Sequence, residues 1–164
     1  MAEISDPKQL FIHKLGAAYT MEKTVLKMLE KNAKAAQSDD LRNQFRHHHD
    51  ETEQQVSNLE LVFTDVGSDP ETLPCPAIDG LKKESEQLIK QTDDALVDAV
   101  LLAGAAETEH HEIAVYEGLI TDAEAMGRRE AVNLLRRNLE QEQHTLEEVK
   151  KASQRFAQQL AYQP

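Results

Sequence analysis

The side chains of this chain that could carry out chemistry are charged residues standing where an apolar helical stripe requires a core residue. Apolar residues recur every three to four positions along four long segments, and a charged residue at such a position would enter the protein interior. The residues that pass this test are Glu22, His48, Glu109, Glu112 and Glu142. Glu51 joins the set because it lies one turn on from His48, within about 60° of the centre of the stripe. Several carboxylates in one interior would repel one another strongly unless cations neutralise them, so the set predicts a metal site.

The distances of these carboxylates from the predicted turns place them at one depth. Glu22 precedes a turn near residue 37 by about 15 residues, and Glu51 follows that turn by about 14. Glu112 and Glu142 are each about 15 residues from a turn at Gly127. At about 1.5 Å per residue, all four carboxylates lie roughly 20–23 Å from their turns. We therefore expect them to meet in one layer.

The ligand types indicate which metals would bind. Six ligand residues on four helices match the number that a dinuclear carboxylate site uses. Oxygen-rich ligands with one imidazole favour iron or manganese over a closed structural zinc site. We expect two iron ions per chain, with manganese as the alternative, bridged by Glu51 and Glu142. Each glutamate taken alone could instead be solvated or ion-paired at a stripe edge, and His48 could be a hydrogen-bonded core histidine.

Other residues with metal-binding side chains fall outside the stripes. Glu107 and His110 form a literal Glu-x-x-His motif, yet both fall on the polar face of their helix. The other histidines that we expect at the surface are His13, His47, His111 and His144, while His49 borders a stripe. Tyr19 and Tyr116 lie about one turn from core glutamates, where core packing is expected and a hydrogen bond to a ligand or a redox role is the alternative.

Four long helices must position these residues, and the sequence marks their ends. The expected helices cover residues 7–36, 39–66, 93–126 and 129–161, with N-caps at Asp6, Ser38 and Thr92 and C-terminal glycines at Gly67 and Gly127. Residues 67–76 have the composition of a loop, and residues 77–90 are expected to form a short helix within a long crossover. The pattern predicts an all-α, ferritin-like four-helix bundle of two antiparallel hairpins, as a single domain over residues 1–164.

Composition supports this architecture and excludes several function classes. Of 164 residues, 40% are apolar and only 4% are aromatic, which suits packed helices better than a β-sandwich. The formal charge of −12 would repel phosphate backbones, so nucleic acid is not an expected partner. No apolar stretch is long enough to cross a bilayer, residues 1–5 lack the features of a signal peptide, and Cys75 is the only cysteine. We therefore expect a cytoplasmic protein that does not contact membranes.

Several short motifs, spread over nearly the whole chain, occur together in one known group of proteins. They are Tyr19-x-x-Glu22-Lys23, His48-x-x-Glu51-Thr52, Cys75-x-Ala77-x-x-Gly80-Leu81, Glu109-His110-x-Glu112-Ile113-Ala114-x-Tyr116 and Leu139-x-x-Glu142. In these motifs the chain resembles the bacterial YciF-like stress proteins of the ferritin-like superfamily. The resemblance implies a dimeric four-helix bundle with an extra short helix, linked to stress responses.

The chain departs from the usual ferritin-like pattern of two inward Glu-x-x-His motifs. It has one reversed pair, His48-x-x-Glu51, and offers Glu142-x-x-Thr145 with no histidine at the matching place. Gln141 stands where relatives often have glutamate. We therefore expect the second metal to be held by carboxylates alone, or weakly.

Three functions are compatible with this sequence. Our leading hypothesis is a di-iron or di-manganese oxidoreductase that reacts with oxygen or peroxide during stress; no catalytic residue is identified. The alternatives are an iron-binding protein without turnover and a metal-free structural helical module whose polar layer shares protons. Cys75, between Pro74 and Pro76, is expected to be an inert or half-exposed loop thiol, with redox chemistry as the alternative.

Overall fold

The computed structural model describes residues 4–161, and helices account for most of this range. In chain order they are α1 (Pro7–Ala35), α2 (Asp39–Asp65), α3 (Pro76–Lys90), the 3₁₀ helix η1 (Asp94–Leu96), α4 (Val97–Ala125) and α5 (Arg129–Ala161). No strand occurs within residues 4–161. The all-α prediction is confirmed, and the four long helices and the short one are those that the apolar spacing predicts.

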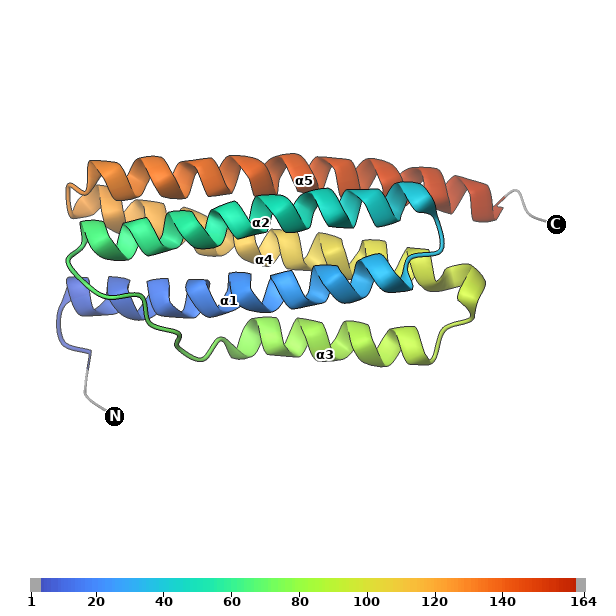
Figure 1. The fold of residues 1–164 in the computed structure, drawn as a ribbon, viewed down its shortest axis with the longest axis horizontal. Helices are drawn as coiled ribbons and strands as arrows, with labels where there is room; N and C mark the ends of the chain where they lie inside the picture. The colour runs from blue at the N-terminus through green and yellow to red at the C-terminus, as the bar shows by residue number, and fades with distance from the viewer. Residues whose placement is uncertain (1–3, 162–164) are drawn as a thin grey trace.

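The long helices form an antiparallel bundle of two hairpins (Figure 1). α1 and α2 are joined by a short turn at one end of the bundle, and α4 and α5 by a turn at the opposite end. α2 packs on α5 and α1 packs on α4, so the two hairpins enclose a common core. The long connection between the hairpins carries α3, which lies outside the bundle against α4 and α1. This is the predicted layout of two hairpins joined by a crossover.

Helix ends follow the capping residues in the sequence. The side chain of Asp6 accepts a hydrogen bond from a backbone N–H in the first turn of α1, and Ser38 does the same for α2. Gly67 and Gly127, which follow α2 and α4, have φ values of 72° and 70°. This left-handed conformation is favourable for glycine, and it ends both helices where the sequence predicts.

The start of α4 corrects one expectation. Thr92 is not the N-cap of this helix, because its hydroxyl donates to the carbonyl oxygen of Leu88 at 2.7 Å, at the end of α3. Threonine hydroxyls commonly form this bond to the preceding helical turn. Asp93 instead accepts from the backbone N–H of Ala95 and caps η1, so the α-helix itself begins at Val97.

The turn between α1 and α2 is attached to the other hairpin by Asp98 of α4. This carboxylate is 3% exposed and accepts hydrogen bonds from the backbone N–H groups of Gln37 at 2.7 Å and Ser38 at 2.9 Å. Hydrogen bonds to an ionised acceptor are stronger than neutral ones. Asp98 therefore holds the two hairpins in register at this end of the bundle.

No helix among residues 4–161 combines the length and apolar character needed to cross a bilayer. The expectation about a signal peptide rests on residues 1–5, of which residues 1–3 lie outside the described range.

Candidate metal centre

The four long helices direct five of the predicted ligands into one region of the core. Glu22 lies on α1, His48 on α2, Glu109 and Glu112 on α4, and Glu142 on α5. All five are at most 5% exposed. Each occupies a position on the stripe that its helix turns toward the bundle interior, as the spacing predicts.

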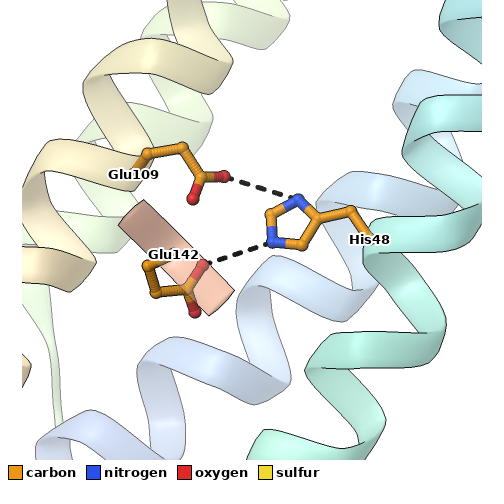
Figure 2. Close-up of side chains that lie close together, drawn as sticks. All are labelled: His48, Glu109 and Glu142. Atoms are coloured by element: carbon orange, nitrogen blue, oxygen red, sulfur yellow. Dashed lines mark ion pairs between the residues drawn. The ribbon is translucent and has the colours of Figure 1, made fainter. Parts of the chain in front are cut away.

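These side chains gather into two groups, and within each group the ligand atoms lie within 4.8 Å of one another. His48, Glu109 and Glu142 form one group, and Glu22, Glu112 and Glu142 form the other. Figure 2 shows the imidazole of His48 between two carboxylates, with Nδ1 3.4 Å from Glu109 Oε1 and Nε2 3.4 Å from Glu142 Oε2. Glu142 belongs to both groups, so it lies where a bridging ligand would.

Glu51, the sixth predicted ligand, belongs to neither group. Its side chain is 21% exposed, and its Oε1 lies 3.6 Å from Nε2 of His47. Glu51 also lines a polar groove of about 580 Å³ formed by α2 and α5. The structure therefore brings five of the six residues together and places Glu51 between them and the surface. Of the two expected bridging residues, only Glu142 has the position for that role.

The carboxylate layer, defined here as Glu22, Glu109, Glu112 and Glu142, contains many acceptors without donors. Six of its buried oxygens accept no hydrogen bond from a donor outside the layer: Glu22 Oε2, Glu109 Oε2, and both oxygens of Glu112 and Glu142. Within the layer, Glu109 is in hydrogen-bonding reach of Glu142, and Glu112 of Glu22. Nε2 of His48, although 3.4 Å from Glu142 Oε2, likewise makes no hydrogen bond. Buried polar atoms in proteins are nearly always paired, and buried charges need partners or metals. Oxygen donors with one imidazole fit a pair of cations such as iron or manganese.

Burial alters the acidity of this layer. Desolvation, followed by repulsion from Glu142, raises the pKa of Glu22 to about 8, although a hydrogen bond from Tyr116 opposes the shift. The same two causes raise the pKa values of Glu109 and Glu112 well above the ordinary range. Protons are therefore retained in the layer at neutral pH unless cations displace them.

A chain of hydrogen bonds supports the layer from one side. Tyr116 donates its hydroxyl hydrogen to Oε1 of Glu22 and accepts from Nδ2 of Asn138 at 3.0 Å. Asn58 donates in turn to Oδ1 of Asn138 at 2.7 Å. Burial, and then the charge of Glu22, raise the pKa of Tyr116 well above its usual range, so this hydroxyl stays a donor. Such outer partners orient ligating carboxylates.

Most of the residues that the spacing excludes lie away from the core. The exposed residues of this set are His13, His47, Glu107, His110 and His144. His49, at the border of its stripe, is partly buried and lies 3.6 Å from Oε1 of Glu30. Tyr19 donates to Glu60 at 2.7 Å rather than to a carboxylate of the layer.

His111 and Cys75 differ from the expectations for them. His111 is half-buried rather than exposed, and desolvation lowers its pKa. Cys75 is buried at the N-cap of α3 rather than half-exposed. Both line a mainly apolar groove of about 340 Å³ formed by α1, α4 and the start of α3. The periodicity of a single helix does not show where the crossover packs, so it misses this burial.

Gln55 and Asn58 of α2 are buried polar residues that the spacing did not select. Val56 supplies the apolar residue that regular spacing requires between Thr52 and Leu59, and it packs against the core. Gln55, beside it, is fully buried. The apolar spacing therefore gave no signal for Gln55.

Comparisons with known proteins agree with this architecture. Residues 6–161 match the family described as a domain of unknown function (DUF892). The chain is 36% identical over 140 residues to protein YciF of Escherichia coli strain K12, which covers 84% of each chain.

Solved structures share the fold. The crystal structure of the E. coli stress protein YciF superposes with a TM-score of 0.90 at 31% identity, covering 94% of this chain and 99% of that chain. YcfI of Rhodopseudomonas palustris, described as a candidate structural protein, gives a TM-score of 0.88 at 34% identity, covering 90% and 95%. A protein of Xanthomonas campestris at 20% identity, with a TM-score of 0.74, shares the fold alone.

Proposed function

This chain belongs to the family described as a domain of unknown function (DUF892), and we propose that it is a dinuclear metal protein of the stress response. Its similarity to the E. coli stress protein YciF supports the stress context. The metal proposal depends on one observation, the six buried carboxylate oxygens that accept no hydrogen bond from a donor outside the layer. Two divalent cations would balance the charge of four ionised glutamates and supply partners for those oxygens.

Each residue of the centre has a distinct role in this proposal. His48 and Glu109 would hold one ion, Glu22 and Glu112 the other, and Glu142 both, following the two groups of ligand atoms. Tyr116 orients the Glu22 carboxylate by its hydrogen bond. When bound, an iron or manganese pair would supply electron transfer to oxygen or peroxide. The chain contributes ligand positions, burial and exclusion of water.

Metal content tests the proposal directly. Protein purified without a metal-chelating tag, loaded anaerobically with Fe(II) or Mn(II) and desalted, should retain about two ions per chain by elemental analysis. The variants His110→Ala and His144→Ala remove exposed imidazoles and should leave this stoichiometry unchanged. Retention of less than about 0.2 ions per chain by the unmodified protein would contradict a metal centre of this type.

Single-turnover oxidation separates an oxidoreductase from an iron-binding protein. Fe(II)-loaded protein is mixed with oxygen or with peroxide, re-reduced, and mixed again. An oxidoreductase should oxidise the same number of iron equivalents in each cycle and keep its metal. A binding protein without turnover should lose this reactivity after the first cycle or react no faster than iron in buffer.

A metal-free structural module is the second candidate. The raised pKa values of Glu22, Glu109 and Glu112 support it, because protonated carboxyl groups can share hydrogen bonds without cations. The description of the R. palustris relative as a candidate structural protein points the same way. If this candidate is correct, protein loaded with metal and desalted should retain none, and added metal should not change the melting temperature.

A further inference from the structure

Gln55 lies wholly inside the bundle, yet neither atom of its side-chain amide has a hydrogen-bond partner. The neighbouring buried amides behave differently. Asn58 donates to Asn138, and Asn138 donates both to Tyr116 and to the backbone of Gln55. One amide without partners therefore stands beside two that are well paired.

Hydrogen bonds and helix geometry place this amide about one helical turn from the level of the carboxylate layer. The carbonyl oxygen of Gln55 accepts from Asn138 Nδ2 at 3.2 Å, and the same nitrogen donates to Tyr116, whose hydroxyl binds Glu22. Gln55 is thus level with Tyr116 and Asn138, one turn along α2 from Glu51. Helical side chains lean toward the N-terminus of their helix. The Gln55 side chain therefore leans from its own level toward the carboxylates.

An unpaired amide in this position is unfavourable. It gives up its hydrogen bonds to water on folding and gains none in return. An apolar side chain of similar volume would fill the same space without that loss. Buried polar groups in proteins are nearly always satisfied by the chain, by water or by a ligand. The amide of Gln55 thus indicates a partner that is not part of the chain.

We propose that Gln55 binds a small ligand with lone pairs, of the size of peroxide or azide, beside the metal pair, with its Nε2–H donating to that ligand. The inference rests on the proposed function, because the metals provide the second attachment of the ligand. Ionised carboxylates only accept hydrogen bonds, and the Tyr116 hydroxyl hydrogen already binds Glu22. Gln55 supplies the donor that an oxygen or nitrogen ligand of the centre requires.

A polar groove on the surface lies close to this position. The groove of about 580 Å³ formed by α2 and α5 is lined by Glu51 and Asn58, which flank Gln55 on α2. Glu51 is partly exposed, whereas Asn58 is 6% exposed and belongs to the buried hydrogen-bond chain. The groove therefore comes to the level of Gln55 along α2, while Gln55 itself is fully buried and does not line it.

Cobalt and azide provide a test that needs no turnover. Co(II) is titrated into unmodified protein and into Gln55→Met, and its visible bands give the metal stoichiometry; azide is then titrated into each loaded protein. Both proteins should bind the same number of cobalt ions. The azide Kd of Gln55→Met should rise about 10-fold or more, as expected for the loss of a hydrogen bond to a charged ligand. Gln143→Met, which alters an exposed glutamine on α5, should behave like the unmodified protein.

The outcomes separate this inference from the proposed function. If unmodified protein binds no cobalt, the metal function itself fails. If cobalt binds but azide does not, or if azide binds equally to Gln55→Met, the ligand role of Gln55 is overturned while the metal function stands. Gln55→Leu is a second apolar replacement that guards against a packing defect peculiar to methionine. If both apolar variants lose cobalt, Gln55 supports the metal rather than a ligand, and the inference is again overturned.

Discussion

Glu142 is the residue on which both halves of the carboxylate layer depend. It belongs to both groups of ligand atoms, and its charge is the second cause of the raised pKa values of Glu22, Glu109 and Glu112. We predict that Glu142→Gln raises the unfolding free energy of metal-free protein at pH 7.5 by about 1–3 kcal/mol, because it replaces a buried carboxyl group, whose ionisation is opposed by burial and by its acidic neighbours, with a neutral amide. The same change should weaken binding of both ions by at least about 100-fold. Denaturant unfolding and metal titration measure the two effects.

The matched control is Glu140→Gln on the exposed face of the same helix. It removes the same charge but should alter neither metal affinity nor, beyond about 0.5 kcal/mol, the unfolding free energy. A Glu142→Gln protein that is destabilised without metal and keeps both ions would show that Glu142 is paired in some other way. A protein that loses one ion only would show that the two groups do not share this carboxylate.

At the scale of single residues, the sequence was informative wherever a charge interrupted an apolar stripe. Glu22, Glu112 and Glu142 could be found in this way because the helical period determines which face a residue occupies. The separation of Glu51 from them was not visible in the sequence, because Glu51 lies one turn from His48 and within about 60° of the centre of the stripe. Whether the Gln55 amide has a hydrogen-bond partner depends on contacts among three helices. The apolar pattern of a single helix therefore cannot predict it.

The contacts at Gly16 show how the crossover is positioned on the bundle, and Gly80 provides a contrast. The backbone N–H of Leu73 donates to the carbonyl oxygen of Gly16 at 3.1 Å, so the crossover passes directly over α1. A Cβ atom at Gly16 would lie 2.9 Å from the Leu73 side chain and 3.1 Å from the carbonyl oxygen of Glu71. A Cβ atom at Gly80, within α3, would meet nothing within 4 Å. The absence of a side chain therefore matters at Gly16 and not at Gly80.

We predict that alanine at these two positions has opposite effects on stability. Gly80→Ala should raise the unfolding free energy by about 0.5–1 kcal/mol, because alanine restricts the unfolded chain and favours helix. Gly16→Ala should lower it by about 1–3 kcal/mol, since overpacking against Leu73 and Glu71 outweighs the same helical gain. Chemical denaturation of the two variants measures both values. If Gly16→Ala is as stabilising as Gly80→Ala, the crossover does not pack closely on α1.

The elements themselves were largely predictable from local signals. Residues that cap or end a helix interact with the backbone a few positions away, so the sequence alone can indicate them. This holds for Asp6, Ser38, Gly67 and Gly127. The start of α4 was misplaced because threonine and aspartate compete for capping roles, and the choice at Thr92 depends on the preceding helix. The path of the crossover over Gly16 is a contact between distant segments, which capping and periodicity do not encode.

For the whole molecule, the two hairpins meet across a layer that would be unfavourable if fully ionised. The layout of the bundle followed from loop lengths, because two short turns and one long connection allow few arrangements of four helices. The protonation state of the layer depends on all four helices at once. The protonation state should therefore affect the unfolding free energy of the whole bundle, which both pH and metal binding change.

In metal-free protein, the raised pKa values determine the sign of the pH dependence. Glu22 has a pKa of about 8 in the folded state against an ordinary value of 4.5, so between these pH values the folded state binds more protons than the unfolded state. Stability must then fall as pH rises across this window, by up to about 1.4 kcal/mol per pH unit for each such proton. Below about pH 4.5 both states are protonated and the contribution levels off. Glu109 and Glu112, with pKa values raised in the same direction, add to the effect.

Metal should change this dependence, and thermal melts at pH 5.5 and 7.5, with and without metal, measure it. Metal-free protein should melt at a higher temperature at pH 5.5 than at pH 7.5. Saturating Fe(II) or Mn(II) should stabilise the protein at pH 7.5 by about 3–4 kcal/mol at a few hundredfold excess over Kd, and should flatten or reverse the trend because protons then compete with metal. The overall charge of −12 also favours lower pH through surface repulsion. Glu142→Gln leaves that surface nearly intact and removes the second cause of the raised pKa values but not desolvation, so it should reduce the pH dependence without abolishing it. If Glu142→Gln keeps the full pH dependence, repulsion from Glu142 contributes nothing to it. Identical melting temperatures in all four conditions would contradict a clustered carboxylate core and favour the structural module.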